Sequence, residues 1–358
     1  MAQIKLNRKK LQENYLFLDK LFKERNIEWG VVTKLLCGNV IYLKELIALG
    51  VTEMHDSRVS NLKKIKKLDS NIQTVYIKPP SKKNISSIVK CADVSFNTEI
   101  YTIQMLSDEA KKQNKTHGII IMIEMGDLRE GVLGEELLSF YEQVFSLPNI
   151  DIRGIGTNLN CLSGVMPTQD KLIQLSLYKQ LIEAKFNVTI PWVSGGTSVA
   201  IPLMLKKARP MAVNHFRVGE AIFFGKDLFT GQTIEGMHND VFQLFAEIIE
   251  ITQKPDNPTG ELGANVAGNT FEISGKVDLS TTSLRAILDI GLLDMQPQYL
   301  ESCNPRITIV DASSDMMVID ISNSEKKYEV GDLVEFNLQY MGALYLLNSD
   351  YIEKIVEE

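Results

Sequence analysis

Residues 30–38 read Gly-Val-Val-Thr-Lys-Leu-Leu-Cys-Gly, and this stretch gives the first indication of the fold. The run from Trp29 to Val32 is apolar but too short for a helix, which favours a buried strand. Lys34 follows at the end of that run, and the next residues turn the chain into a segment with helical spacing. The pattern predicts a strand, a turn and a helix, with a lysine at the C-terminal end of the strand.

Lys34 is the first candidate catalytic residue. At the mouth of a buried strand its stem would lie in low dielectric, where desolvation disfavours the ammonium and lowers the pKa of the amine. A neutral amine can attack a carbonyl group and form a Schiff base. A strand-end lysine that only reaches for solvent is the commoner arrangement. The assignment therefore depends on the residues at the ends of the later strands.

Short apolar runs alternate with longer helical patterns through the first two thirds of the chain. Amphipathic spacing predicts a helix within residues 3–26. Strands are expected at 30–33, 53–55, 74–77, 94–96, 118–124, 151–156, 191–193 and 216–224, and helices at 40–49, 57–67, 81–90, 98–114, 133–146, 169–185 and 199–207. Eight strands separated by helices match a (β/α)8 TIM-type barrel. An open doubly wound sheet is the alternative, but residues 34–38 are not the GxGxxG turn that it would normally carry.

The pattern changes after Gly225, where alternating runs and turn signals replace the helical spacing. This predicts a barrel over residues 1–235 and a mainly β C-terminal domain, without a long helix, over residues 236–358. Strands of the second domain are expected at 242–253, 269–273, 283–290, 306–310, 316–321 and 333–338.

Composition narrows the classes of function. A net charge of −7 argues against a nucleic-acid groove or an anionic membrane surface. No apolar run is long enough to span a bilayer. The N-terminus lacks the positively charged segment followed by an apolar segment that is typical of a signal peptide. The four cysteines lack CxxC spacing and the four histidines lack HxxxH pairing, so no metal site is expected. Reduced thiols favour a cytoplasmic enzyme.

Polar residues follow most of the expected barrel strands, and barrel enzymes place their active sites on these loops. Lys34 is one of them. The others are His55–Arg58, Glu124–Gly131, Thr157–Asn160, Ser194–Ser198 and His215–Glu220.

Ser194-Gly195-Gly196-Thr197-Ser198 is the most informative of these loops. Two glycines allow close approach of the backbone, and free N–H groups at the start of the next helix would hold an anion. A glycine-rich turn with a Ser or Thr helix cap explains the same residues. Together with Lys34, an anion site in one barrel favours a phosphorylated carbonyl cofactor, namely pyridoxal 5′-phosphate.

Arg217 fits the same hypothesis. An arginine facing the pyridine nitrogen donates a hydrogen bond but does not give up its proton, so the ring stays unprotonated. Such a ring is a weaker electron sink and suits brief removal and return of a proton at one carbon. An ion pair with Glu220 or Asp227 is the alternative.

These motifs together resemble the fold-type III pyridoxal-phosphate enzymes of the alanine racemase group, and more closely the alanine/ornithine racemase subgroup. The similarity covers nearly the whole chain. It implies that Lys34 forms the Schiff base, that Arg129 binds near the cofactor ring oxygen and the substrate carboxylate, and that the sites are shared head-to-tail in a homodimer. Residues 313–316 resemble the segment that enters the neighbouring subunit's site. The implied cofactor-binding residues are Lys34, Asn158, Ser194, Gly196, Thr197, Ser198, Arg217, Gly219 and Glu220.

Four positions depart from the alanine racemases. Leu292 occupies the place of the tyrosine that acts as the second base, and Asn158 that of a histidine over the ring. Gly38 replaces a tyrosine on the phosphate, and Met122 replaces a lysine that positions the arginine loop. Racemisation by two bases needs a proton donor opposite Lys34. The candidates for that base or for substrate binding are Asp289, Asp294, Ser314, Cys303 and Tyr351.

The resemblance implies a cytoplasmic, homodimeric racemase that binds a small amino acid, with ornithine as the expected substrate and no nucleic acid or membrane partner. Asp289 or Asp294 would meet a distal ammonium group, and the alternative is that both cap a turn or a strand end. A racemase for alanine, for lysine or for many amino acids remains an alternative. So do a non-catalytic pyridoxal-phosphate carrier and a lyase or decarboxylase on the same scaffold. The zinc-dependent relatives need a histidine near the C-terminus, and none follows His238.

Overall fold

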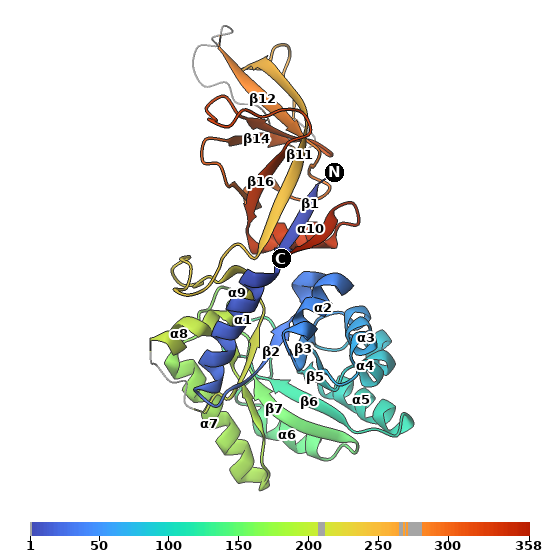
Figure 1. Ribbon diagram of the computed structural model, residues 1–358. Helices are drawn as coiled ribbons and strands as arrows, with labels where there is room; N and C mark the ends of the chain where they lie inside the picture. The colour runs from blue at the N-terminus through green and yellow to red at the C-terminus, as the bar shows by residue number, and fades with distance from the viewer. Residues whose placement is uncertain (1, 207–211, 265–267, 269, 271–280) are drawn as a thin grey trace. The chain divides into compact units, whose positions relative to one another are not determined.

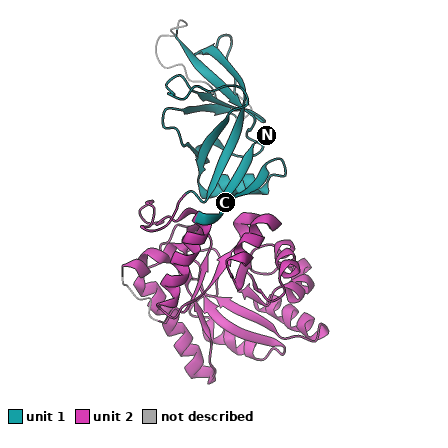
Figure 2. Cartoon of the chain, in the orientation of Figure 1, with its two compact units in different colours: residues 1–9, 240–358 teal, residues 10–239 magenta. Residues whose placement is uncertain are grey.

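The computed structural model describes residues 2–206, 212–264, 268, 270 and 281–358 (Figure 1). The chain divides into two compact units (Figure 2): residues 10–239 form one, and residues 1–9 with 240–358 form the other. This boundary lies close to the one expected at residue 235. The first nine residues, expected in the barrel, lie instead with the C-terminal unit.

The larger unit is a parallel barrel. Its strands are β2 (Glu28–Val32), β3 (Glu53–Asp56), β4 (Gln73–Tyr76), β5 (Val94–Asn97), β6 (His117–Met122), β7 (Ile150–Gly156), β8 (Trp192–Ser194), β9 (Gly196–Thr197) and β10 (His215–Val218). They pair in the order β8-β7-β6-β5-β4-β3-β2-β10-β9. Because only Gly195 separates β8 from β9, the chain itself closes the ring. The TIM-type barrel is confirmed, and the open doubly wound sheet is excluded.

Helices connect the barrel strands. They are α1 (Arg8–Lys23), α2 (Val40–Ala48), α3 (Val59–Leu68), α4 (Ile85–Cys91), α5 (Ile100–Lys112), α6 (Leu137–Phe145), α7 (Gln169–Phe186), α8 (Ile201–Leu205) and α9 (Glu220–Phe224). Several begin at a polar cap, as expected for backbone N–H groups that have no helical partner. Asn39 caps α2, Glu99 caps α5 and Thr168 caps α7 through side-chain hydrogen bonds.

The helix predicted within residues 3–26 is confirmed as α1. Residues Gln3–Asn7 form the strand β1, which was not predicted, with Ile4 and Leu6 buried between more exposed neighbours. Residues 216–224 do not form one strand, because β10 ends at Val218 and α9 begins at Glu220. The side chains from Ala221 to Phe224 are all buried, and a fully apolar run does not distinguish a buried helix from a buried strand.

Apolar side chains fill part of the barrel interior. One buried cluster joins Val75, Val94, Phe96, Ile120, Met122 and Trp192. These residues come from β4, β5, β6 and β8, which do not all pair with one another, so they meet through the interior. Met122 is therefore part of the packed core.

The smaller unit is mainly antiparallel. Its elements are β1, β11 (Phe242–Pro255), β12 (Thr282–Leu288), β13 (Leu300–Ser302), β14 (Thr308–Ala312), β15 (Met317–Asp320), β16 (Leu333–Leu338), α10 (Tyr340–Asn348) and β17 (Glu353–Glu357). β1 pairs with β11 antiparallel and with β17 parallel. The expected mainly β domain is confirmed, although β13, β17 and the short α10 were not predicted. The strand expected at 269–273 lies outside the described residues. Among the helices of the described part, none is long and apolar enough to cross a membrane.

Candidate functional site

Lys34 lies two residues after the end of β2 and begins a 3₁₀ turn over Lys34–Leu36. Thr33 anchors this point, because its N–H donates to His55 O at 2.8 Å and its hydroxyl lies 3.0 Å from Asp56 Oδ2. The Lys34 side chain is exposed, whereas the sequence predicted a stem in low dielectric. The reason is that Lys34 belongs to the turn beyond the strand.

The structure brings the two expected phosphate segments together. Ser198 Oγ accepts hydrogen bonds from Gly219 N at 3.3 Å and Ala221 N at 3.1 Å. Thr197 occupies the N-cap position of the short 3₁₀ turn Ser198–Ala200 but makes no capping bond with its side chain. Of the alternative, a Ser or Thr cap, Thr197 therefore caps no helix with its side chain, whereas Ser198 accepts backbone N–H groups at the start of α9. Burial raises the pKa of Glu220, and the charges of Lys226 and Lys34 oppose that shift, so Lys34 lies near this segment.

Arg217 is buried and held by three hydrogen bonds. Nη1 donates to Ser194 O at 2.5 Å and to Ser194 Oγ at 2.7 Å, and Nη2 donates to Thr157 O at 2.7 Å. Within the described residues it forms no ion pair with Glu220 or Asp227. Burial lowers the pKa of Arg217 to about 10, so the guanidinium stays positively charged at neutral pH.

The loop after β6 is tied to the loop after β7. The buried Asp127 carboxylate accepts backbone N–H groups of Cys161, Leu162, Ser163 and Val165. Burial opposes ionisation of Asp127, but these four hydrogen bonds lower its pKa overall. The loop is therefore fixed by its carboxylate.

Arg129 lies two residues further along this loop and pairs with Glu130 through Nε and Nη2. This contact raises the pKa of Arg129. After burial, the charges of Glu130 and Arg129 both affect the pKa of Arg217, consistent with an arginine loop near the buried guanidinium.

The candidates for a second base lie in the other unit. Asp289, Ser314, Cys303 and Tyr351 are exposed residues. Partial desolvation of the Cys303 thiol and the nearby charge of Glu335 raise its pKa to about 11. Two backbone hydrogen bonds, from Leu292 N to Ser313 O and from Leu293 N to Ser314 O, join the segment around Leu292 to the segment around Ser314. Asp294 Oδ1 accepts a hydrogen bond from Ser349 Oγ at 2.6 Å.

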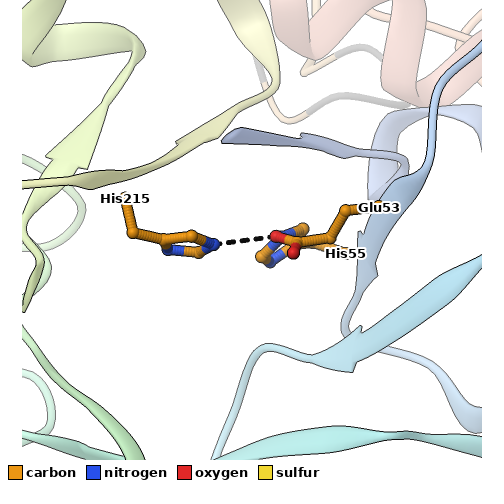
Figure 3. A group of neighbouring side chains, drawn as sticks. All are labelled: Glu53, His55 and His215. Carbon is orange, nitrogen blue, oxygen red and sulfur yellow. Dashed lines mark hydrogen bonds and ion pairs between the residues drawn. The ribbon is translucent and has the colours of Figure 1, made fainter. Parts of the chain in front are cut away.

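Three residues near the site were given no role from the sequence. Glu53 and His55 on β3 meet His215 on β10, and all three are buried (Figure 3). Glu53 and His55 are two residues apart on a strand, so their side chains share a face. That spacing is a sequence signal for Glu53 and His55, but their contact with His215 depends on strand order. Cys161, in the loop held by Asp127, was also not singled out.

The comparisons with known proteins decide the family. The family model described as the N-terminal domain of alanine racemase matches residues 6–227. The chain belongs to this alanine racemase family. Its N-terminal match covers the barrel strands that carry Lys34, Arg129 and Arg217.

Two characterised relatives match over nearly their whole length. The ornithine racemase of Acetoanaerobium sticklandii is 37% identical over 355 residues, which is 98% of both chains. The lysine racemase of Thermotoga maritima is 29% identical over 354 residues, covering 98% of this chain and 97% of the relative.

Solved structures of similar fold include alanine racemases and a D-threonine aldolase. The enzyme from Bartonella henselae, which contains covalently bound pyridoxal phosphate, has a TM-score of 0.75 at 17% identity, with 99% of each chain covered. The enzyme from Clostridium difficile 630 has a TM-score of 0.74 at 16% identity, with 100% of this chain and 96% of the other covered. At this identity the likeness shows the fold.

Proposed function

We propose that this protein is a pyridoxal-phosphate-dependent amino-acid racemase that interconverts L- and D-ornithine. The full-length similarity to an ornithine racemase carries the proposal. Lysine is the second candidate substrate, because a lysine racemase also matches over the full length. Both are diamino acids, which favours a site with an acceptor for a distal ammonium group.

The residues present fit the cofactor. Asn158 Nδ2 is buried and has no hydrogen-bond partner in the described part of the chain. This is expected of a donor that would bind the cofactor. Arg217 Nη1 and Nη2 are used within the protein, while no hydrogen bond among the described residues uses Nε. This N–H would face the pyridine nitrogen and retain its proton.

The phosphate would be held by the joined segments around Ser198 and Gly219. The hydroxyl groups of Thr197 and Ser198 and the backbone N–H of Glu220 would supply these contacts, and the Gly219 N–H would exchange Ser198 Oγ for the phosphate. Ser194 and Gly196 would complete the cofactor site, Ser194 by holding Arg217 and Gly196 by close approach of its backbone. A Cβ at Gly196 would lie 2.3 Å from the Phe216 ring, so this position admits no side chain.

Pyridoxal phosphate, when bound, withdraws electrons from the α-carbon of the amino acid and makes its proton acidic. Lys34 would hold the cofactor aldehyde and then remove or return that proton on one face. Arg129 would orient the substrate carboxylate with Nη1, the nitrogen that Glu130 does not use. The charged Arg217 would donate to the ring without transferring its proton.

The opposite face needs a second proton carrier, and Leu292 has no such group. Asp289, Asp294, Ser314, Cys303 and Tyr351 stay the candidates, with Asp289 or Asp294 also available to a distal ammonium. We further propose a cytoplasmic homodimer in which the C-terminal unit of one subunit completes the site of the other. Sedimentation of the purified protein tests the dimer.

The decisive experiment combines a spectrum with a chiral assay. The purified protein should show the absorption band of lysine-bound pyridoxal phosphate and should racemise L-ornithine. Lys34→Ala should lose the band and lower kcat by about 10³-fold, because the attachment point and one proton carrier are removed. Lys226→Ala, a lysine close to Glu220 with no proposed role, should keep the band.

Four results would contradict the proposal. Full turnover by Lys34→Ala excludes that lysine. Turnover of alanine alone excludes the diamino-acid substrate. A cofactor band without loss of α-deuterium from any amino acid favours a carrier, and release of carbon dioxide or ammonia favours a decarboxylase or lyase.

A further inference from the structure

A chain of hydrogen bonds runs from Arg217 into the interior of the barrel unit. Arg217 Nη1 lies 2.7 Å from Ser194 Oγ, and Ser194 Oγ lies 2.6 Å from His215 Nδ1. His215 Nε2 then lies 2.8 Å from Glu53 Oε1, the contact drawn in Figure 3. All four side chains are buried, so solvent does not screen the interactions between them.

The donor at each step follows from Arg217. A guanidinium only donates, so Ser194 Oγ accepts from it and has its own hydrogen left to donate to His215 Nδ1. A neutral His215 that accepts at Nδ1 carries its hydrogen on Nε2, and that N–H donates to Glu53. The chain thus fixes one tautomer of His215.

Glu53 ends the chain as a carboxylate. His55 Nε2 lies 2.5 Å from the same Oε1, and Gln73 Nε2 donates to Oε2 at 2.7 Å. Burial alone raises the pKa of Glu53, but its contacts with His215 and His55 outweigh burial and lower the pKa overall. The buried negative charge of Glu53 in turn helps to stabilise the charged form of Arg217. The two charges therefore balance each other across Ser194 and His215.

Glu53, His55 and His215 also form a set of possible metal ligands, since their nearest ligand atoms lie within 4.8 Å of one another. Ligands at 2.0–2.1 Å on a tetrahedral ion would lie about 3.3 Å apart. Glu53 Oε1 lies only 2.5 Å and 2.8 Å from the two Nε2 atoms. These are hydrogen-bond distances, so both Nε2 atoms carry a hydrogen and donate it, whereas a nitrogen that binds a metal carries none.

We propose that Glu53 and His215 are positioning residues that act through Ser194 to hold the Arg217 guanidinium against the ring nitrogen of the cofactor. This inference rests on the proposed function, because it requires pyridoxal phosphate beside Arg217. A guanidinium fixed on one edge presents its remaining N–H in a single direction. Cutting this relay, which runs from Glu53 through His215 and Ser194 to Arg217, releases the Ser194 hydroxyl. Arg217 then keeps only its bonds to Ser194 O and Thr157 O, and its remaining N–H is held less firmly toward the ring nitrogen.

Two substitutions of His215 separate the two contacts. His215→Gln places an amide near the Nε2 position, so the donor to Glu53 is kept and the acceptor for Ser194 is lost. His215→Asn places an amide oxygen near the Nδ1 position, so the acceptor for Ser194 is kept and the contact with Glu53 is lost. Glu53→Gln keeps the shape and removes the charge.

His117→Gln is the matched control. His117 is likewise a buried strand histidine that bonds to a serine, with Nε2 lying 2.8 Å from Ser95 Oγ, but neither residue contacts the relay. Damage to packing alone should affect this variant as much as the others.

The first measurement uses the loaded enzyme. His215→Gln and Glu53→Gln should change the pH dependence of the cofactor's absorption spectrum and weaken binding of pyridoxal phosphate about tenfold, the loss expected for one hydrogen bond to a charged group. His117→Gln should match the wild type in both. Unchanged spectra in His215→Gln and Glu53→Gln, or an equal change in His117→Gln, would overturn the relay. A wild-type protein that binds no pyridoxal phosphate would instead refute the proposed function.

The second measurement needs no cofactor and no variant. Nitrogen-15 NMR of the histidine side chains in the apoprotein should show His55 and His215 as neutral rings with the hydrogen on Nε2. A hydrogen on Nδ1 of His215 would mean that Nδ1 does not accept from Ser194 Oγ, and this would overturn the relay. Stoichiometric zinc that a chelator removes with a change in both histidine signals would show a metal site in its place.

Discussion

Gly30 leaves space on β2 for the relay on the neighbouring strands. A Cβ at this position would lie 2.3 Å from His55 Nε2 and 2.6 Å from Glu53 Oε1, far closer than van der Waals contact. Both of those groups are buried and hydrogen-bonded, so neither moves aside without losing a partner. The absence of a side chain at Gly30 is thus a requirement of packing.

Gly30→Ala should lower the free energy of unfolding by about 1–3 kcal/mol, the usual effect of overpacking a core. Urea denaturation at neutral pH measures this. Gly263→Ala is the control, because no atom of the described residues lies within 4 Å of a Cβ at that position. Equal stability of Gly30→Ala and the wild type would show that the cluster is looser than these distances indicate.

His117 makes stability depend on pH. Burial lowers its pKa from 6.5 to about 4, so the folded state favours the neutral ring. Between pH 6.5 and about 4, unfolding therefore takes up a proton at His117. The stabilisation that comes from the neutral ring is complete above the pKa of the unfolded state and is lost as the pH falls toward the pKa of the folded state.

His117→Gln should lose roughly 3 kcal/mol less stability than the wild type when the pH is lowered through that interval. Paired urea titrations at neutral pH and near the lower pKa give the difference. The other buried groups contribute equally to the pH dependence of both proteins, so their contributions cancel in the difference. These groups are Glu53, His55, Asp56 and Glu220. Parallel pH profiles would count against a neutral His117.

At the scale of elements, helix α2 begins directly after the turn that carries Lys34. Asn39 caps it by accepting from Ile41 N at 2.9 Å and Tyr42 N at 3.4 Å. These bonds satisfy two N–H groups that have no partner within the helix. The cap therefore fixes where the turn stops and the helix starts.

Asn39→Ala should destabilise the protein by about 1 kcal/mol through the loss of this cap. Asn84→Ala is a close control, because Asn84 is the N-cap residue of α4 but makes no side-chain capping bond. Chemical denaturation of both variants measures the difference. If both lose the same stability, the Asn39 bonds contribute nothing.

Element boundaries were predictable where polar caps or alternating residues mark them. The strand at 94–96 and the helices at 40–49 and 169–185 agree with β5, α2 and α7 to within one residue at each end. Boundaries were wrong where the signal is ambiguous. The apolar run 216–224 switches from strand to helix at Gly219, and a continuous apolar run has no period that reveals the change.

At the scale of the whole molecule, the chain starts in one unit, builds the barrel and returns to the first unit. β1 lies between β11 and β17, with Ile4 and Leu6 fully buried. An interior strand supplies hydrogen bonds to both neighbours, so its removal exposes two strand edges at once.

Deletion of residues 2–7 should speed hydrogen exchange in β11 and β17, while β3 to β6 in the barrel keep their protection. Hydrogen exchange followed by mass spectrometry tests this prediction, and the barrel strands serve as the internal control. Unchanged exchange in β11 and β17 would show that β1 is dispensable to its unit.

The sequence by itself predicted the alternation of strands and helices, the place of Lys34 after β2, and the segments that carry Arg129, Thr197 and Arg217. These are local signals, because periodicity, caps and glycines act over a few residues. Only the tertiary structure brought Glu53 to His215, which lies 162 residues away. That contact depends on strand order and register, and no local pattern encodes which inward-facing side chains meet when the barrel closes.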